Sequence, residues 1–186
     1  MQNPDLIQQM IERAEAVQAI VSIIGTIKDA CQYAVATTKK QGGRTVVAAG
    51  LKPEEQGYLK KECEASGLRL LEFPLRPHAN EIHTSLTIVD GGVAETGTLV
   101  LDSTSEDVRI ATMLAETHVA VLPALKIKPD TTALENELNA VLKADLPSYT
   151  AFITGASRTA DIERVLAIGV HGPQELHILI MEENKA

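Results

Sequence analysis

Residues 45–73, TVVAAGLKPEEQGYLKKECEASGLRLLEF, decide the fold class. TVVAAG (45–50) is short, apolar and β-branched at its start, as expected of a strand that is buried on both faces. Pro53 suits the first turn of the helix that follows, and Gly67 can close that helix. LRLLEF (68–73) has the pattern of a second strand. A strand, a helix and a strand in this order predict parallel neighbours in a sheet covered by helices.

The sequence on either side continues this alternation. Upstream, apolar residues at spacings of three and four predict an amphipathic helix over 6–24, ended by Gly25, and a second helix that starts at Ile27 and stops before Gly42. Downstream, strands are predicted over 85–92, 96–103, 118–123, 149–154 and 175–181, and helices over 107–116 and 131–143. We therefore predict one α/β domain over residues 1–186. It is a three-layer sandwich with a mostly parallel sheet, on which the N-terminal helices of residues 1–42 pack.

The composition excludes several classes of protein. Lys and Arg number 17 against 25 Asp and Glu, a formal net charge of −8, and aromatic residues make up 3% with no Trp. An acidic chain that lacks stacking side chains is not expected to bind nucleic acid. Cys31 and Cys63 form no CxxC pair, so we expect reduced thiols and neither a structural zinc nor an iron–sulfur cluster. The chain begins without a basic signal region, and its run AIVSIIGTI is too short to cross a membrane, so we expect a cytoplasmic protein.

Three segments place glycines and small polar residues beside predicted strands, where α/β proteins bind ligands. The first is DGGVAETGTLVL, residues 90–101. Gly91 and Gly92 allow backbone conformations closed to other residues, and the carboxylate of Glu95 then lies in a turn where it could face a ligand. A tight β-connection with a solvated Glu95 is the structural alternative.

The second segment is ITGASRTADIERV, residues 153–165. A strand, a glycine, small polar residues and a helix follow one another, so free amides at the helix start favour an anion. Ser157 and Thr159 add hydroxyl groups, and Arg158 can grip a carboxylate or phosphate. The segment matches neither GxxxxGK[ST] nor GxGxxG. The alternative is an ordinary helix start capped by Thr159.

The third segment is GVHGPQELHILI, residues 169–180. His171 lies between glycines in a predicted turn, where it could bind an anion or act as an acid or base, or could simply be structural. A triad of Ser157, Asp161 and His171 lacks the GxSxG elbow. The histidines of HANEIH, residues 78–83, fit no standard metal motif, so we expect no metal site.

Taken in order, VDGGVAETGTLVL, ITGASRTADIE and GVHGPQELHILI resemble the signature segments of the LUD-domain family of lactate-utilization proteins, over residues 84–181. The resemblance implies a Rossmann-like fold similar to the sugar isomerases and CoA transferases. It also implies a part in oxidising L-lactate to pyruvate, beside partner proteins that carry iron–sulfur clusters, while this chain binds no cofactor of its own.

The resemblance also assigns candidate site residues. Glu95 and His171 are the catalytic candidates. The candidates for binding a small carboxylate or phosphate are Thr96, Gly97, Thr98, Gly155, Ser157, Arg158, Thr159 and Asp161. We predict that Glu95, Ser157, Arg158 and His171 converge on one cleft. Three functions remain open: a subunit of a lactate-oxidising assembly, a stand-alone enzyme acting on a phosphorylated or CoA-linked carboxylate, and a non-catalytic scaffold or regulatory domain.

Overall fold

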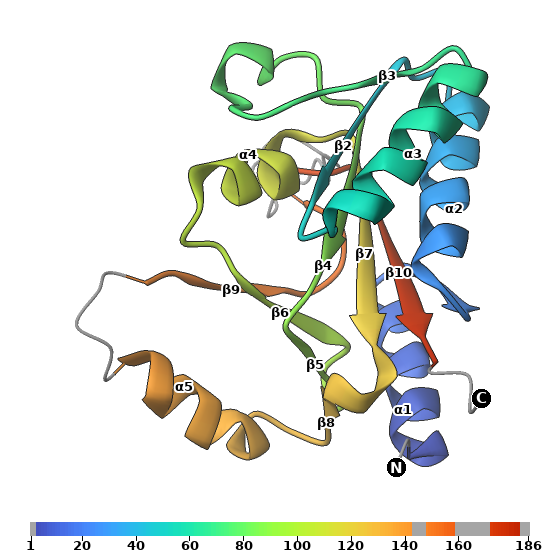
Figure 1. Ribbon diagram of the computed structural model, residues 1–186. Coiled ribbons are helices and arrows are strands. Elements are labelled where there is room, and N and C mark those ends of the chain that lie inside the picture. The colour runs from blue at the N-terminus through green and yellow to red at the C-terminus, as the bar shows by residue number, and fades with distance from the viewer. Residues whose placement is uncertain (1–2, 143–147, 159–171, 183–186) are drawn as a thin grey trace, which may run out of the picture.

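A parallel sheet forms the centre of the protein (Figure 1). The computed structural model describes residues 3–142, 148–158 and 172–182. Among these residues, six strands pair in parallel in the order β1-β10-β7-β4-β2-β3. Their bounds are Ile20–Ile24 for β1, Thr45–Ala49 for β2, Arg69–Leu70 for β3, Thr84–Ile88 for β4, Thr117–Pro123 for β7 and Glu175–Met181 for β10.

Two helices, α2 (Ile27–Lys40) and α3 (Pro53–Ala65), cover one face of this sheet. Thr26 starts α2 with a capping box, in which its hydroxyl accepts from the Asp29 amide and the Asp29 carboxylate accepts from the Thr26 amide. Side chains at helical spacing then face the strands and form a continuous apolar cluster. From the helices it takes Ala30, Cys31, Ala34, Val35, Leu59 and Cys63, and from the strands Val46, Ala48, Leu86, Val119, Val121 and Leu179.

The opposite face is covered in a less regular way. A second, smaller mixed sheet lies there in the order β8-β5-β6-β9, with bounds Ile127–Lys128, Gly91–Val93, Thr98–Asp102 and Thr150–Ile153. The helix α1 (Pro4–Ala16) packs with this sheet and the main sheet in one apolar cluster. The helix α4 (Glu106–Leu114) covers the neighbouring part of the main sheet, and α5 (Glu135–Leu142) follows Leu134, which packs on the outer side of the small sheet. Short 3-10 turns lie at Arg76–His78, Ala124–Lys126 and Thr132–Leu134.

The structure confirms an α/β fold with a mostly parallel sheet between layers of other elements. It corrects the helix predicted over 6–24, because α1 ends at Ala16 and residues 20–24 form the edge strand β1. Gln18 has a left-handed φ of 65°, which turns the chain out of the helix. Val21 fits the helical spacing, but it also belongs to the β-branched run IVSII. These residues form inter-strand hydrogen bonds with β10, and this tertiary contact favours a strand over a continued helix. Residues 1–42 therefore contribute a strand as well as helices.

The small sheet was not predicted. Residues 85–92 were expected to form a strand that runs into a glycine turn, but the chain leaves the main sheet after Ile88, and Gly91 and Gly92 belong to strand β5 of the small sheet. The backbone passes between the sheets at Val89, which donates to Val121 O, and Asp90, which donates to Val100 O. LRLLEF also contributes only a two-residue strand at the far edge of the main sheet. Within the described residues, no helix is long and apolar enough to cross a membrane.

Candidate functional site

Two of the predicted segments meet at the carboxyl end of α1. Gly97 and Gly155 both have positive φ, of 65° and 72°, and both lie against the last turn of that helix. A Cβ on Gly97 would stand 2.4 Å from the backbone nitrogen of Ala14, and one on Gly155 would stand 2.6 Å from the carbonyl oxygen of Val17. Only glycine lets the backbone approach this closely in this conformation. These two glycines therefore join the small sheet to α1.

A chain of three hydroxyl groups links the same two segments. The Oγ1 atoms of Thr96 and Thr98 are 2.7 Å apart, and Thr98 Oγ1 is 2.7 Å from Thr154 Oγ1. The antiparallel pairing of β6 with β9 brings these residues together, since Leu99 lies opposite Ile153. Thr98 is buried, whereas Thr96 and Thr154 are exposed. The hydroxyl chain thus runs outward to solvent, where it can donate to or accept from a ligand.

The third segment joins this cluster through Ser157. The Ser157 amide donates to the carbonyl of Pro173 at 2.8 Å, and Gly172 packs against the Ser157 side chain. Arg158 reaches back to α1, and its guanidinium donates to the carbonyl oxygen of Val17 at 2.9 Å. A cation at a helix carboxyl end is favourable, so Arg158 has a structural partner as well as the predicted role with anions.

The predicted catalytic residues remain predictions. Glu95 is exposed in the turn after β5, and its backbone amide donates to the carbonyl of Pro129. The histidine predicted beside it, His171, lies outside the described residues, as do the predicted ligand-binding residues Thr159 and Asp161. The structure thus brings together residues 96–98, 154–158 and 172–173, and the convergence of Glu95 with His171 stays a prediction.

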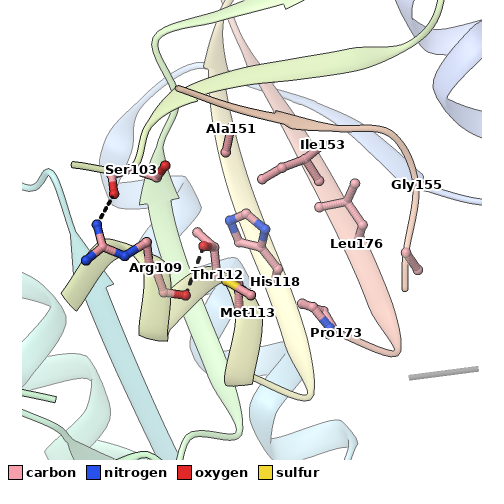
Figure 2. Close-up of a pocket in the computed structure, with 11 residues that line it drawn as sticks. Ser103, Arg109, Thr112, Met113, His118, Ala151, Ile153, Gly155, Pro173 and Leu176 are labelled. Carbon is pink, nitrogen blue, oxygen red and sulfur yellow. Dashed lines mark hydrogen bonds between the residues drawn. The ribbon is translucent and has the colours of Figure 1, made fainter. Parts of the chain in front are cut away.

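A cavity of about 150 Å³ opens beside these segments, between α4, β9 and the starts of β7 and β10 (Figure 2). The side chains that line it are mainly apolar, and several of the lining residues belong to the second and third predicted segments. The lining residues from those segments are Ile153, Gly155, Ala156, Pro173 and Leu176, and the others are Ser103, Arg109, Thr112, Met113, His118 and Ala151. The cavity is therefore bounded by the signature residues rather than remote from them.

His118 supplies the most deeply buried polar group of this lining. Its side chain is 1% exposed, and its Nε2 lies 2.7 Å from the hydroxyl of Thr87 on the neighbouring strand. Burial lowers the pKa of His118 from 6.5 to about 4, because a charged imidazolium would lose its hydration. At neutral pH the ring is therefore uncharged. Figure 2 shows it among Thr112, Met113 and Leu176.

A cation lies at the rim of the cavity. Arg109 on α4 donates from Nη1 to the carbonyl oxygens of Ser103 and Thr104, at 2.6 and 2.7 Å, and its guanidinium stands 5.4 Å from the centre of the Tyr149 ring. These contacts fix the side chain, while its remaining N–H groups are still potential donors. The hydroxyls of Ser103 and Thr112 donate to backbone carbonyls, so each oxygen can still accept a hydrogen bond.

Sequence reasoning missed His118 and Arg109. HVAVLP was recognised as a buried strand, but nothing marked its histidine as facing a cavity. A histidine within an otherwise apolar strand is a weak signal, since most such residues are structural. The position of Arg109 depends on where α4 packs, which local patterns do not reveal.

Other potential sites among the described residues have structural explanations. Cys31 and Cys63 are free, buried thiols; burial and nearby carboxylates raise the pKa of Cys31 to about 12 and that of Cys63 to about 11. Such thiols are poor nucleophiles and poor metal ligands. In HANEIH, Glu81 pairs with His78 and with Arg69. Within the described parts of the chain, no group of three or more His, Cys, Asp or Glu side chains could hold a metal ion.

The fold and the site define an α/β protein whose six-stranded parallel sheet carries a small mixed sheet, with glycine-rich turns closing beside a cavity. Comparison with known proteins agrees with this class and names it. The model of the LUD domain matches residues 7–181, and the chain belongs to the LUD domain family.

Individual relatives support the assignment. The chain is 32% identical over 122 residues to lactate utilization protein C of Macrococcus caseolyticus, covering 64% of this chain and 51% of that protein. It is 28% identical over 153 residues to lactate utilization protein C of Bacillus subtilis, covering 76% and 64%. It is also 30% identical over 165 residues to the uncharacterized protein YkgG of Escherichia coli, covering 83% and 70%. The chain thus spans about half to two thirds of the length of these relatives.

A solved structure shares the fold. The crystal structure of a DUF162 family protein from Deinococcus radiodurans superimposes with a TM-score of 0.64, covering 95% of this chain and 96% of the other. Its sequence identity is 19%, so this likeness concerns the fold alone.

Proposed function

We propose that this protein is a cluster-free subunit of an assembly that oxidises L-lactate to pyruvate, and that it binds a small carboxylate beside its signature segments. Membership of the LUD domain family and similarity to proteins named lactate utilization protein C support the lactate role. The observation that carries the ligand part is the meeting of residues 96–98, 154–158 and 172–173 beside one cavity.

Electron transfer belongs to other chains in this proposal. Oxidising L-lactate to pyruvate releases electrons, and the partner subunits would carry the iron–sulfur clusters that accept them. This chain would not hold a cluster itself, because its two cysteines are buried and the raised pKa of each thiol opposes ionisation. The assembly would work in the cytoplasm, where such thiols stay reduced.

Growth on L-lactate tests the proposal. Deleting the gene should abolish growth on L-lactate but not on pyruvate, and a tagged copy should restore growth and co-purify with iron–sulfur proteins. Thr98→Val removes the central hydroxyl of the threonine chain with little change of shape, and we expect it to impair rescue. Gly57→Ala, on the exposed side of α3, is the matched control and should rescue fully.

The opposite results have distinct meanings. Normal growth of the deletion strain on L-lactate would contradict the lactate role. Full rescue by the chain without captured iron–sulfur proteins would contradict the assembly, and turnover of a phosphorylated or CoA-linked carboxylate by the purified chain alone would favour a stand-alone enzyme.

A further inference from the structure

We infer that the cavity at His118 holds a short-chain 2-hydroxy or 2-oxo acid, with the oxygen on its second carbon bonded to His118 Nδ1 and its carboxylate directed towards Arg109. The inference rests on the proposed function for the chemical class of the ligand. It adds the place of binding, the residues that select the ligand and the limit on its size.

The polar floor of the cavity carries unused hydrogen-bonding capacity. Among the residues that the structure describes, Thr87 is the hydrogen-bond partner of His118, through Nε2, so Nδ1 is left for a ligand. Ser85 lies opposite His118 on the neighbouring strand and on the same face of the sheet, and within the described residues its buried Oγ has no hydrogen-bond partner. Buried polar atoms without partners are costly in a folded protein. Ser85 Oγ is such an atom, and it lies next to His118, which lines the cavity, so a further hydrogen-bonding group would complete this region.

The size and lining of the cavity limit what that molecule can be. A cavity of this volume, about 150 Å³, is known to hold benzene, so it has room for about six non-hydrogen atoms. L-lactate and pyruvate have that size, and the chain of a longer acid would extend out of the cavity. Ile153, Met113 and Leu176 would surround the methyl group, since their side chains form the apolar part of the lining.

The charge distribution favours an anion with one uncharged polar end. His118 is neutral at physiological pH, so it offers a directional hydrogen bond rather than a charge. Arg109 is the cationic side chain of the lining, and its contacts with Ser103 O, Thr104 O and the Tyr149 ring hold it at the rim. A preorganised guanidinium binds a carboxylate with little loss of side-chain entropy. The apolar side chains of the lining would contact the methyl group of the acid.

Calorimetric titration of the purified full chain tests this arrangement. L-lactate and pyruvate should bind. Propionate, which lacks the second-carbon oxygen, should bind about two- to tenfold more weakly, as expected for the loss of one hydrogen bond to a neutral group. 2-Hydroxyhexanoate should bind more weakly than L-lactate, because the cavity cannot enclose its chain.

Two substitutions at His118 distinguish the roles of its two ring nitrogens. His118→Gln places an amide where Nε2 stood and keeps the contact with Thr87, but it removes Nδ1. The preference for L-lactate over propionate should then disappear while propionate affinity stays unchanged. His118→Asn places an amide near the position of Nδ1 and should retain part of the preference. A purely structural histidine would give no such difference between ligands.

Filling the cavity provides a test that does not involve His118. Ala151→Leu, on β9, should occupy the space and abolish binding, whereas Ala65→Leu at the exposed end of α3 should bind as the parent does. Equal affinities for L-lactate and propionate in the parent, an unchanged preference in His118→Gln, or normal binding by a folded Ala151→Leu protein would each overturn the inference. If the purified chain does not bind L-lactate, although gene deletion abolishes growth on L-lactate and the tagged chain captures iron–sulfur proteins, only the cavity assignment is wrong. If the chain binds L-lactate, but the deletion strain grows normally and no iron–sulfur protein is captured, the proposed function is wrong instead.

Discussion

The two faces of the main sheet are built by different means. On one face, α2 and α3 lie over a continuous apolar layer in which the thiols of Cys31 and Cys63 serve as small apolar groups. The buried polar side chains there are paired, Thr38 with Thr84 and Tyr33 with His177. On the other face, α1, α4 and the small sheet cover buried polar residues and a cavity. Ser85, Thr87 and His118 all point to this second side.

This difference indicates where stability and function reside. A parallel sheet needs cover on both faces, and regular helices achieve this most simply. Two departures from local rules lie on the side of the small sheet: glycines in close contact with the end of α1, and the buried Ser85 Oγ, which has no hydrogen-bond partner among the described residues. Such departures are expected at functional sites and are compensated elsewhere in the fold. Substitutions, acid and ligands should therefore affect the two faces differently.

The largest effect is expected where the small sheet meets α1. Gly97→Ala should lower the free energy of unfolding by about 3 kcal/mol or more, because the added Cβ meets the backbone of Arg13 and Ala14 while φ stays positive. Urea titration followed by circular dichroism measures this loss. A change below about 1 kcal/mol would show that the contact can relax and is not a fixed junction.

A similar decrease in the free energy of unfolding should occur at acid pH, and it should depend on His118. The ring is neutral in the folded protein down to a pKa of about 4, whereas in the unfolded chain it takes up a proton near pH 6.5. The unfolded state therefore binds more protons between these values, and stability falls as pH drops from 6.5 to 4, by about 3 kcal/mol in total. Above pH 6.5 this group causes no change.

His118→Gln isolates the effect, since glutamine does not titrate. The difference in stability between the parent and this variant should vary over pH 4–6.5 and be constant at higher pH. A difference that is constant over the whole range would mean that the imidazole is not held neutral in the fold.

Anion binding at the predicted segment should give an intermediate effect. At about 100 times its dissociation constant, phosphate, sulfate or a small carboxylate should add about 2.7 kcal/mol and raise the melting temperature by several degrees. Arg158→Ala should reduce this response, while its intrinsic cost should stay near 1 kcal/mol, since the side chain is exposed and donates to Val17 O. Chloride at matched ionic strength is the control. If all the anions, chloride included, raised the melting temperature equally, or if Arg158→Ala showed the same rise as the parent, Arg158 would have only its structural contact with α1.

The smallest effect is expected on the helix-covered face. Gly57 lies inside α3 with open space around its Cα, so Gly57→Ala should increase the free energy of unfolding by about 0.5–1 kcal/mol. The same chemical change thus has opposite signs on the two faces. If both substitutions destabilised the protein equally, the contrast between the faces would be wrong.

The sequence predicted the regular half of the molecule better than the irregular half. Short apolar runs such as TVVAAG and HVAVLP, with the helices between strands, carry strong local signals, so the parallel sheet was predictable. The segment 20–24 was misassigned because β-branched residues there also satisfied helical spacing, and only pairing with β10 decides between the two structures. The small sheet forms because the chain leaves the main sheet after Ile88, and tertiary packing rather than the local sequence decides where this happens.

The candidate site was predictable only in part. Glycine-rich segments pointed to Gly97, Gly155 and Arg158, but their contact with the end of α1 requires packing that the sequence does not display. His118 and Arg109 carry no local motif and become candidates only when strand and helix enclose a cavity. The sequence therefore identifies the turns around the site, and the fold identifies its interior.

Hydrogen exchange with and without saturating L-lactate tests most directly whether the ligand binds on the small-sheet face. Peptides from α4, from the start of β7 and from residues 148–158 should exchange more slowly with L-lactate present, because these segments line the cavity. Peptides from α2 and α3 should be unchanged. Slower exchange confined to α2 and α3, or no change anywhere at saturation, would contradict a ligand site on this face.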